Sequence, residues 1–455
     1  MPANLSMESL KAAVTAGEID TVLVCTIDMQ GRLMGKRFHA RHFLDGGWEE
    51  THCCNYLLAT DMEMMTVQGY AATSWASGYG DHVMKPDLST LRLVPWLPGT
   101  ALVLCDLLDH HTHQEVPHAP RAILKRQIAR ASAMGFVPMM ATELEFFLFE
   151  QSYEALRDAN WRDPKTLGGY NVDYAIFGTS KEEEVMRAIR NGLYGAGIPV
   201  ECSKGEAETG QEEINIRYSD ALDTADMHSI VKNGVKEIAH AKGRSVTFMA
   251  KYRHDRVGSS SHVHQSLWTA AGAPAFFDET ADHGMSALMR HYVAGLLHHA
   301  RDITCLLAPY VNSYKRFVAG TFAPTKTVWS LDNRTAGFRI CGEGTKGVRV
   351  ECRIGGADLN PYLAMAALLA AGLDGIERKL DLAPAMSGDA YLGTDMPEVP
   401  KTLGEAASLM KGSAMLRTAF GDAVIDHYHR AALWEIEEQN RVVTDWELRR
   451  GLERA

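Results

Sequence analysis

The chain has 455 residues, of which 46% are hydrophobic and 23% are charged, and its formal net charge at pH 7 is −11. This composition is typical of a globular protein with enough core for two or three domains, and the negative charge argues against nucleic acid or an anionic membrane surface as a partner. Residues 1–11 lack the pattern of a secretory signal, no segment approaches the length of a membrane span, and the eight cysteines include no Cys-x-x-Cys pair. We therefore expect a cytoplasmic protein with reduced thiols.

The first part of the chain predicts a small β-rich domain. Its expected strands form a hairpin followed by two more strands, over residues 21–28, 32–38, 91–94 and 101–107. His110, His111 and His113 follow on a connecting segment, where a metal cluster is the alternative to ordinary polar loop residues. We place this domain at 16–110 and a larger second domain at 117–455.

The larger region alternates helical and extended patterns. Helices are predicted over residues 121–134, 181–190, 221–242 and 361–379, and in the segment from residue 426 onwards. Ser180 is the expected N-cap of the second of these helices, with Glu183 completing a capping box. Asn360 is a good N-cap for the fourth, with Pro361 at its first position.

Residues 141–149 (Ala-Thr-Glu-Leu-Glu-Phe-Phe-Leu-Phe) predict a strand that carries charge inside an apolar segment. Glu143 and Glu145 fall on one face of it, roughly 6.6–6.8 Å apart. Two ionised carboxylates so placed repel each other and lose hydration, which indicates a cation nearby. The alternative is a strand with one solvated face.

The same pattern, a polar pair at alternate positions of a strand, occurs three more times. The pairs are Glu213 with Asn215, His262 with His264, and Glu351 with Arg353. With Glu143, Glu145 and also Glu206, which stands shortly before the turn at Gly210, they include five carboxylates and the imidazole of His262. If they converge, these are hard ligands suited to Mg²⁺ or Mn²⁺.

These motifs resemble those of class I glutamine synthetases. The matching runs are Glu-Leu-Glu-Phe-Phe-Leu-Phe (143–149), Gly-Gln-x-Glu (210–213), Thr-Phe-Met-Ala-Lys (247–251), His-Val-His-Gln-Ser-Leu-Trp (262–268), Asn-Ser-Tyr-Lys-Arg (312–316), Asn-Arg-Thr (333–335) and Asn-Pro-Tyr-Leu-Ala (360–364). The resemblance implies an α+β fold, with a small N-terminal β-grasp-like domain and a large catalytic domain in which helices surround an antiparallel β-sheet active-site barrel. It also implies a dodecamer of two stacked hexamers.

The resemblance further implies a set of site residues, with ATP as a substrate and about two to three Mg²⁺ (or Mn²⁺) ions per active site. Glu145, Glu206 and Glu213 would hold the first metal, and Glu143, His262 and Glu351 the second. Arg316 and Arg353 would bind the carboxylates of glutamate, Gly258 would allow close backbone approach, and Arg334 would lie on the transferred phosphoryl group. The residues expected at ATP are Arg339 and Arg349 on the phosphates, His264, Ser266, Tyr218 beside the adenine and Glu201 near the ribose.

The chain departs from the family pattern on the ammonium side. Within residues 319–324, Phe322 stands where glutamine synthetases carry a catalytic glutamate, and the acidic stretch expected near residues 51–56 is missing. An aromatic ring in place of an acid suits a carbon-bearing nucleophile. We therefore predict an ATP-dependent ligase, closest in character to γ-glutamyl-amine synthetases, that forms a γ-glutamylamide through γ-glutamyl phosphate. The alternatives are a glutamine synthetase that uses ammonium and an inactive family member with a structural or regulatory role.

Overall fold

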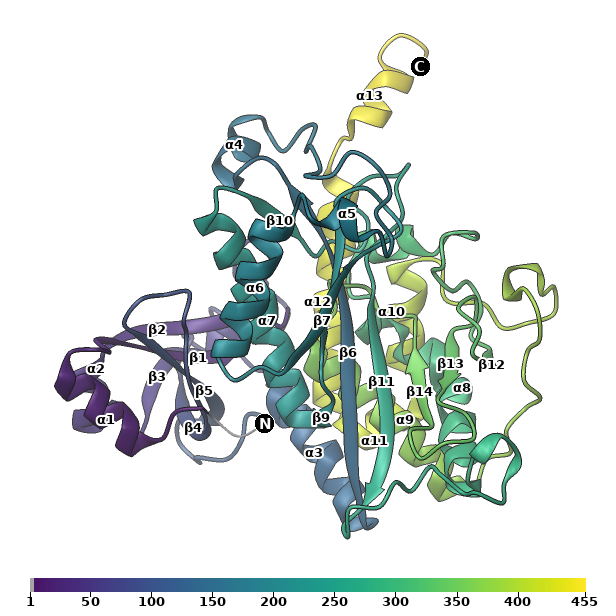
Figure 1. Cartoon of the computed structure of the whole chain (residues 1–455), viewed down its shortest axis with the longest axis horizontal. Helices are drawn as coiled ribbons and strands as arrows, with labels where there is room; N and C mark the ends of the chain where they lie inside the picture. The colour runs from purple at the N-terminus through teal and green to yellow at the C-terminus, as the bar shows by residue number, and fades with distance from the viewer. Residues whose placement is uncertain (1–3) are drawn as a thin grey trace.

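The computed structural model describes residues 4–455 and contains two β-sheets. The first sheet has the strand order β2-β1-β5-β4-β3 and lies at the left of Figure 1, beside α1 and α2. Its strands are β1 (Thr21–Ile27), β2 (Leu33–His39), β3 (Thr51–Cys54), β4 (Asp81–Leu93) and β5 (Thr100–Asp109). The predicted hairpin is confirmed, because β1 and β2 pair antiparallel from Thr21↔His39 to Ile27↔Leu33. The two other predicted strands correspond to the end of β4 and to β5.

The second sheet has nine strands and carries the conspicuous polar pairs. Its order is β12-β13-β14-β11-β6-β8-β7, and β9 and β10 also pair with β6. The strands are β6 (Phe136–Phe149), β7 (Val200–Gly205), β8 (Gln211–Ile216), β9 (Ser219–Asp220), β10 (Ser245–Thr247), β11 (Ser261–Thr269), β12 (Trp329–Leu331), β13 (Phe338–Cys341) and β14 (Arg349–Cys352). The paired strands are antiparallel except for β12 with β13. The long strands β6 and β11 run side by side through the centre of the molecule (Figure 1).

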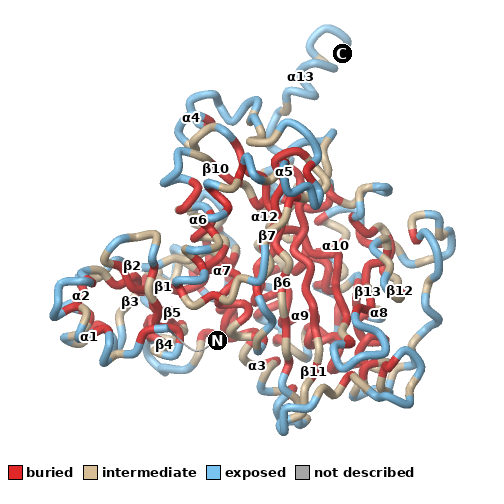
Figure 2. Tube along the Cα trace, viewed as in Figure 1, coloured by how far each residue is buried: buried red, intermediate tan, exposed pale blue. Residues whose placement is uncertain are grey.

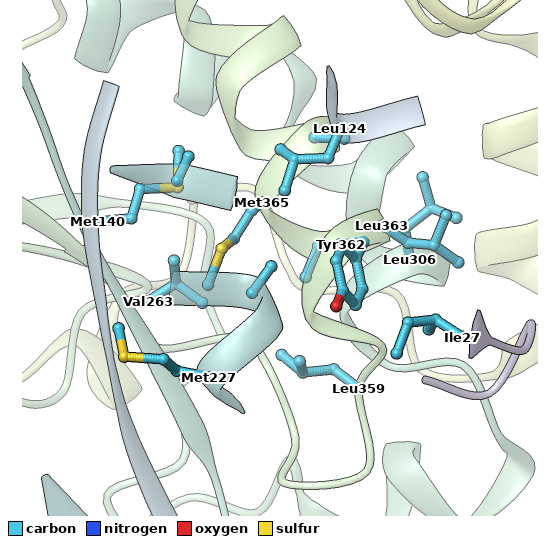
Figure 3. Close-up of a cluster of buried hydrophobic side chains, with 14 of the residues drawn as sticks. Ile27, Leu124, Met140, Met227, Val263, Leu306, Leu359, Tyr362, Leu363 and Met365 are labelled. Carbon is cyan, nitrogen blue, oxygen red and sulfur yellow. The ribbon is translucent and has the colours of Figure 1, made fainter. Parts of the chain in front are cut away.

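The helices cover this sheet and close the core. They are α1 (Met7–Ala16), α2 (Ala40–His42), α3 (Pro120–Ala133), α4 (Tyr153–Asp158), α5 (Ile176–Thr179), α6 (Glu183–Gly195), α7 (Ala221–Ala241), α8 (Ala287–Leu307), α9 (Pro361–Arg378), α10 (Leu403–Gly412), α11 (Ala414–Phe420), α12 (Asp422–Arg441) and α13 (Asp445–Gly451). Figure 3 shows part of the core, where Ile27 of β1, Met140 of β6, Met227 of α7 and Tyr362 of α9 gather. None of the helices within residues 4–455 is long and apolar enough to cross a bilayer.

A buried arginine joins the two sheet regions. The guanidinium of Arg121 on α3 pairs with Asp87 of β4 (2.6 Å), Asp106 of β5 (2.6 Å) and Asp226 of α7 (3.1 Å). The hydroxyl of Tyr362 donates a further hydrogen bond to Asp226. The two sheets fall on either side of residues 110–117, and the domain boundaries at 16–110 and 117–455 stay a prediction.

Two helix termini test the predicted caps. Asn360 caps α9 as expected, because its Oδ1 accepts hydrogen bonds from the backbone N–H groups of Tyr362 and Leu363. The Ser180 prediction is wrong: α6 begins at Glu183, and its N-cap is Glu182. Ser180 instead ends α5, where its hydroxyl donates to the Ile176 carbonyl at 2.8 Å, so it is engaged with the preceding turn.

The C-terminal segment is helical, as predicted, but only part of it packs. Helix α12 buries Val424, Ile425 and Tyr428 against the body of the chain, whereas α13 buries no residue. Figure 2 shows α13 as an exposed projection at the end of the chain. Within the single chain, therefore, α12 packs against the rest of the protein as predicted and α13 does not.

Candidate active site

The register of the central strands brings the polar pairs together. On β6, Glu143 lies opposite His262 of β11 on one side and Asn215 of β8 on the other. Glu145 lies opposite Glu213 of β8. Residues directly opposite each other on neighbouring strands share a face of the sheet, so these side chains point into one space. That space is a cavity of about 350 Å³, and five of the six predicted metal ligands, all but Glu351, line it directly.

The first ligand set consists of Glu145, Glu206 and Glu213. Each offers a carboxylate oxygen, and the three oxygens lie within 4.8 Å of one another. Burial, and then the neighbouring carboxylates, raise the pKa of both Glu145 and Glu213. The side chains of the described residues therefore do not neutralise these three carboxylates. A divalent cation, which prefers oxygen ligands, fits this donor set.

Glu145 is fixed before any ligand binds. Its oxygens accept hydrogen bonds from the Ser260 backbone N–H (2.7 Å), the Ser260 hydroxyl (2.6 Å) and the Gln211 side-chain amide (3.2 Å). Partners that orient a ligating carboxylate in this way restrict where the ion can lie. Neither Gln211 nor Ser260 was singled out from the sequence, although Gln211 stands inside the Gly-Gln-x-Glu run.

The second ligand set is centred on Glu143. His262 Nδ1 lies 3.0 Å from a Glu143 oxygen and 3.4 Å from a Glu351 oxygen, so the predicted trio does converge. His264 Nε2 lies 2.9 Å from the other Glu143 oxygen, and Glu143, His264 and Glu351 also offer three atoms within 4.8 Å. Although burial opposes ionisation, hydrogen bonds from His262 and His264 hold the pKa of Glu143 below its usual range. His264, assigned from the sequence to ATP, is thus also placed as a possible ligand.

Two arginines surround Glu351 at the edge of the cavity. Arg353 donates to one of its oxygens at 2.5 Å and Arg339 to the other at 3.0 Å. Burial works against the charge of Glu351, but the positive charge of Arg353 holds the pKa of this carboxyl low. Arg334 is exposed in the cavity wall, where its guanidinium can meet an anionic ligand.

Arg316 also lines the cavity, yet its guanidinium is largely engaged with backbone. Its Nη2 donates to the carbonyls of Arg353, Ile354 and Gly355, at 3.1, 2.5 and 3.0 Å. Burial lowers the pKa of Arg316 to about 10. Its Nε is buried and has no hydrogen-bond partner in the described structure.

Gly258 is needed for this packing. A Cβ added at Gly258 would lie 2.4 Å from Cγ of Arg316 and 2.5 Å from the Ala250 carbonyl oxygen. Any side chain there would displace Arg316 or the backbone. The absence of a side chain at Gly258 therefore lets Arg316 lie against the backbone, in addition to the predicted approach of a ligand.

Of the residues predicted at the nucleotide, Arg339 lines the cavity, and the others lie outside its lining. Tyr218, just after β8, has its ring 6.1 Å from that of Trp268, whose indole N–H donates to the Ser266 hydroxyl. Arg349 donates from Nε to His264 at 3.2 Å. Glu201 is exposed on β7. The structure thus joins Tyr218 to Ser266 through one indole ring, and Arg349 to the second ligand set through His264.

Two residues in the cavity wall are aromatic, over half exposed, and held at positive φ. Phe322 is 56% exposed with φ +58°, and Tyr174 is 70% exposed with φ +57°. The Lys204 ammonium lies 4.5 Å from the Tyr174 ring centroid, and it pairs with Glu206 and with Asp173. Lys204 could have been found from its alternation with Glu206, whereas nothing in the sequence pattern places the loop that carries Tyr174.

Comparisons with known proteins agree with the family that the sequence motifs indicate. A family model described as "Glutamine synthetase, catalytic domain" matches residues 117–451. The chain is 49% identical over 451 residues to a γ-glutamylethanolamide synthetase (GlnA4) of Streptomyces coelicolor, covering 99% of this chain and 96% of that one. It is 38% identical over 440 residues to a glutamate–isopropylamine ligase of a Pseudomonas species, covering 96% and 95%. The solved structure of GmaS without ligand superposes with a TM-score of 0.85 at 28% identity, covering 98% of this chain and 99% of that chain.

Proposed function

The chain belongs to the glutamine synthetase family, and on that premise we propose that it is an ATP-dependent ligase that joins the γ-carboxylate of glutamate to a primary amine. The observation that supports this most is the cavity itself, where two sets of hard ligands adjoin four arginines and an exposed phenyl ring. The relatives named above act on ethanolamine and isopropylamine, by their names, which supports a carbon-bearing acceptor.

The two ligand sets fit a pair of Mg²⁺ or Mn²⁺ ions. Glu145, Glu206 and Glu213 would hold one ion, and Glu143, His262 and Glu351 the other. When bound, such ions neutralise the negative charge that a carboxylate and a triphosphate bring together. The ionic character of the donor set, with five carboxylates and imidazole, supports magnesium or manganese over softer metals.

The protein's own residues would then position the substrates and stabilise the transferred phosphoryl group. In the first step the γ-phosphoryl group passes from ATP to the γ-carboxylate of glutamate, giving γ-glutamyl phosphate and ADP. Arg334, exposed in the wall, would lie on the transferred group, and Arg353 on glutamate. In the second step the deprotonated amine nitrogen attacks the acyl carbon, the C–N bond forms, and phosphate leaves.

Phe322 would line the acceptor end of the cavity. A phenyl ring cannot take a proton from ammonium, but it can shield an acyl phosphate from water and contact the carbon substituent of an amine. Selectivity from such apolar contact is about 1–3 kcal/mol. Glutamine synthesis from ammonium is the second candidate, supported by the 36% identity over 386 residues to the glutamine synthetase of Thermus thermophilus.

We also propose the assembly and compartment that the family resemblance implies. The active site would lie between the small domain of one subunit and the large domain of the next, in a dodecamer of two stacked hexamers. Contacts of this head-to-tail kind close into rings. The exposed Trp75 and the unpacked α13 are surfaces that such contacts could cover. A cytoplasmic location is the matching proposal.

Phosphate release from ATP and glutamate tests the function directly. The purified chain is assayed with ammonium, methylamine, ethanolamine and putrescine as acceptors. We expect release with at least one carbon-bearing amine and little with ammonium. Release with ammonium at least as fast as with every amine would favour glutamine synthesis, and no release with any acceptor would favour an inactive family member.

A further inference from the structure

A second large cavity lies away from the catalytic one. It measures about 990 Å³ and is lined by the segment that leads into β4, the end of β5 with the residues after it, and the first turns of α12. No residue lines both cavities. The histidine-rich segment singled out in the sequence forms part of this wall, so the structure gives that motif a place that the catalytic site does not explain.

Five imidazoles line this cavity. They are His82, His110, His111, His118 and His427. His82 is only 8% exposed, and neither of its ring nitrogens has a hydrogen-bond partner in the described structure. The rings of His118 and His427 lie 4.3 Å apart, and those of His82 and His118 lie 6.3 Å apart. Burying a polar side chain without hydrogen-bond partners costs free energy, which indicates that His82 pairs with a ligand.

The imidazoles act as acceptors. Burial lowers the pKa of His82, His118 and His427, so these rings are neutral near pH 7. A neutral imidazole has one nitrogen that donates and one that accepts. His427 contacts the Leu58 carbonyl through Nε2 at 2.7 Å, which requires the proton on that atom and leaves Nδ1 as an acceptor.

The charge around the cavity is negative. Asp81, Asp109 and Asp426 line it, and none of the lining residues is a lysine or an arginine. Asp426 pairs with Arg417 at 2.9 Å, but no cationic side chain within residues 4–455 forms an ion pair with Asp81 or Asp109. Asp109 accepts hydrogen bonds from the backbone of His111 and from Thr112, which lower its pKa and keep it ionised.

The spacing of the acceptors favours an extended cation over a metal ion. Three ligand atoms come within 4.8 Å of one another only at the catalytic site, as far as residues 4–455 are concerned. The acceptors of this cavity are spread along its wall, where one ion cannot reach three of them. The ring of Tyr70, stacked on His427 with centroids 4.2 Å apart, adds an apolar wall suited to methylene groups.

We propose that this cavity binds a linear alkylammonium with two separated charges, outside the catalytic cavity. One ammonium group would donate to His82 and Asp109, which lie opposite each other on β4 and β5. The other would lie near Nδ1 of His427 and Asp426 at the start of α12, and the carbon chain would run along Tyr70. This site does not depend on the proposed function, since it makes no use of the catalytic residues.

Calorimetric titration of the full chain with putrescine (1,4-diaminobutane) tests the proposal. We expect binding that weakens at least about tenfold in His82→Phe, which keeps the ring shape, and in Asp109→Asn, which removes the charge opposite His82. His240→Phe, an exposed histidine outside the cavity, is the matched control and should bind like wild type. Butylamine, with one charge, should bind more weakly than putrescine.

Binding at the catalytic cavity is separated by a second variant. Glu213→Ala disturbs only the catalytic cavity, so putrescine binding that depends on His82 should persist in it. Unchanged putrescine binding in folded His82→Phe and Asp109→Asn would overturn the proposal, as would His82-dependent binding of Zn²⁺ with no binding of putrescine. Phosphate release is measured separately, so a failure of the ligase activity and a failure of this site give different results.

Discussion

The two cavities hold similar side chains in opposite arrangements. In the catalytic cavity, carboxylates and imidazoles converge in groups of three whose ligand atoms lie within 4.8 Å of one another. In the histidine-lined cavity the acidic and imidazole groups are spread over about 990 Å³, and the buried rings are neutral. Ligand atoms that converge favour a single compact cation, whereas acceptors that lie apart can each bind a separate charged group. The same residue types therefore indicate different ligands, and geometry decides between them.

The largest effect is expected from removing one of the converging ligands. Glu213→Ala should lower turnover by at least about 1,000-fold, or about 4 kcal/mol in the barrier, because a missing hard ligand leaves an ion weakly held and misplaced. Phosphate release and Mn²⁺ titration measure the two effects. Glu150→Ala, at an exposed position just after β6, is the control, and it should behave like wild type. Full activity in Glu213→Ala would remove the assignment of this ligand set.

The histidine-lined cavity should respond to acid in a predictable direction. Burial lowers the pKa of His427 to about 4, from an ordinary value of 6.5. The unfolded chain therefore binds this proton more tightly, and the stability that His427 contributes is complete above pH 6.5 and falls as the pH drops toward 4. Over that interval the free energy of unfolding should decrease by about 3 kcal/mol for this residue.

Urea unfolding at several pH values measures this loss. His427→Gln keeps a donor for the Leu58 carbonyl without a titrating group, so its stability should fall less between pH 6.5 and 4. His240→Gln, at an exposed position, should retain the wild-type pH dependence. Equal slopes for wild type and His427→Gln would show that the buried ring does not carry the effect.

The smallest expected effect concerns the acceptor end of the catalytic cavity. Phe322→Glu should raise the use of ammonium relative to the best amine by about tenfold, or about 1.4 kcal/mol, because a carboxylate stabilises the small cation and can accept its proton. Phe322→Leu, which stays apolar, should show no such gain. The ratio of kcat/KM values for the two acceptors is the measurement. A wild type that prefers ammonium to all amines tested would contradict the premise of this change.

The family, the fold class and the central strand pairs were predictable because they depend on local patterns. The alternation around Glu143 and Glu145 has a period of two, and the matching pairs on three other strands have the same period, so their convergence follows once the strands are neighbours. The comparisons confirm the predicted family. The roles assigned to single residues, such as Arg334 at the phosphoryl group, stay predictions.

What the sequence could not reveal depends on contacts between distant segments. The engagement of Arg316 with three backbone carbonyls requires the turn after β14 to lie against η4 (Val311–Arg316), and no spacing predicts it. Tyr174 reaches the cavity from an irregular loop, and His427 meets His118 across more than 300 positions of the chain. The Ser180 cap failed because a serine can serve the turn before it as well as the helix after it.

Arg121 has a mechanical consequence. Its guanidinium lies between carboxylates of β4, β5 and α7, so swinging the small sheet away from the large one would leave a buried cation and several anions without partners. Removing one member of such a group typically costs about 3–5 kcal/mol. Within one chain the two regions should therefore move as a rigid unit without a hinge, and any opening for substrates must come from surface loops such as those that carry Tyr174 and Phe322.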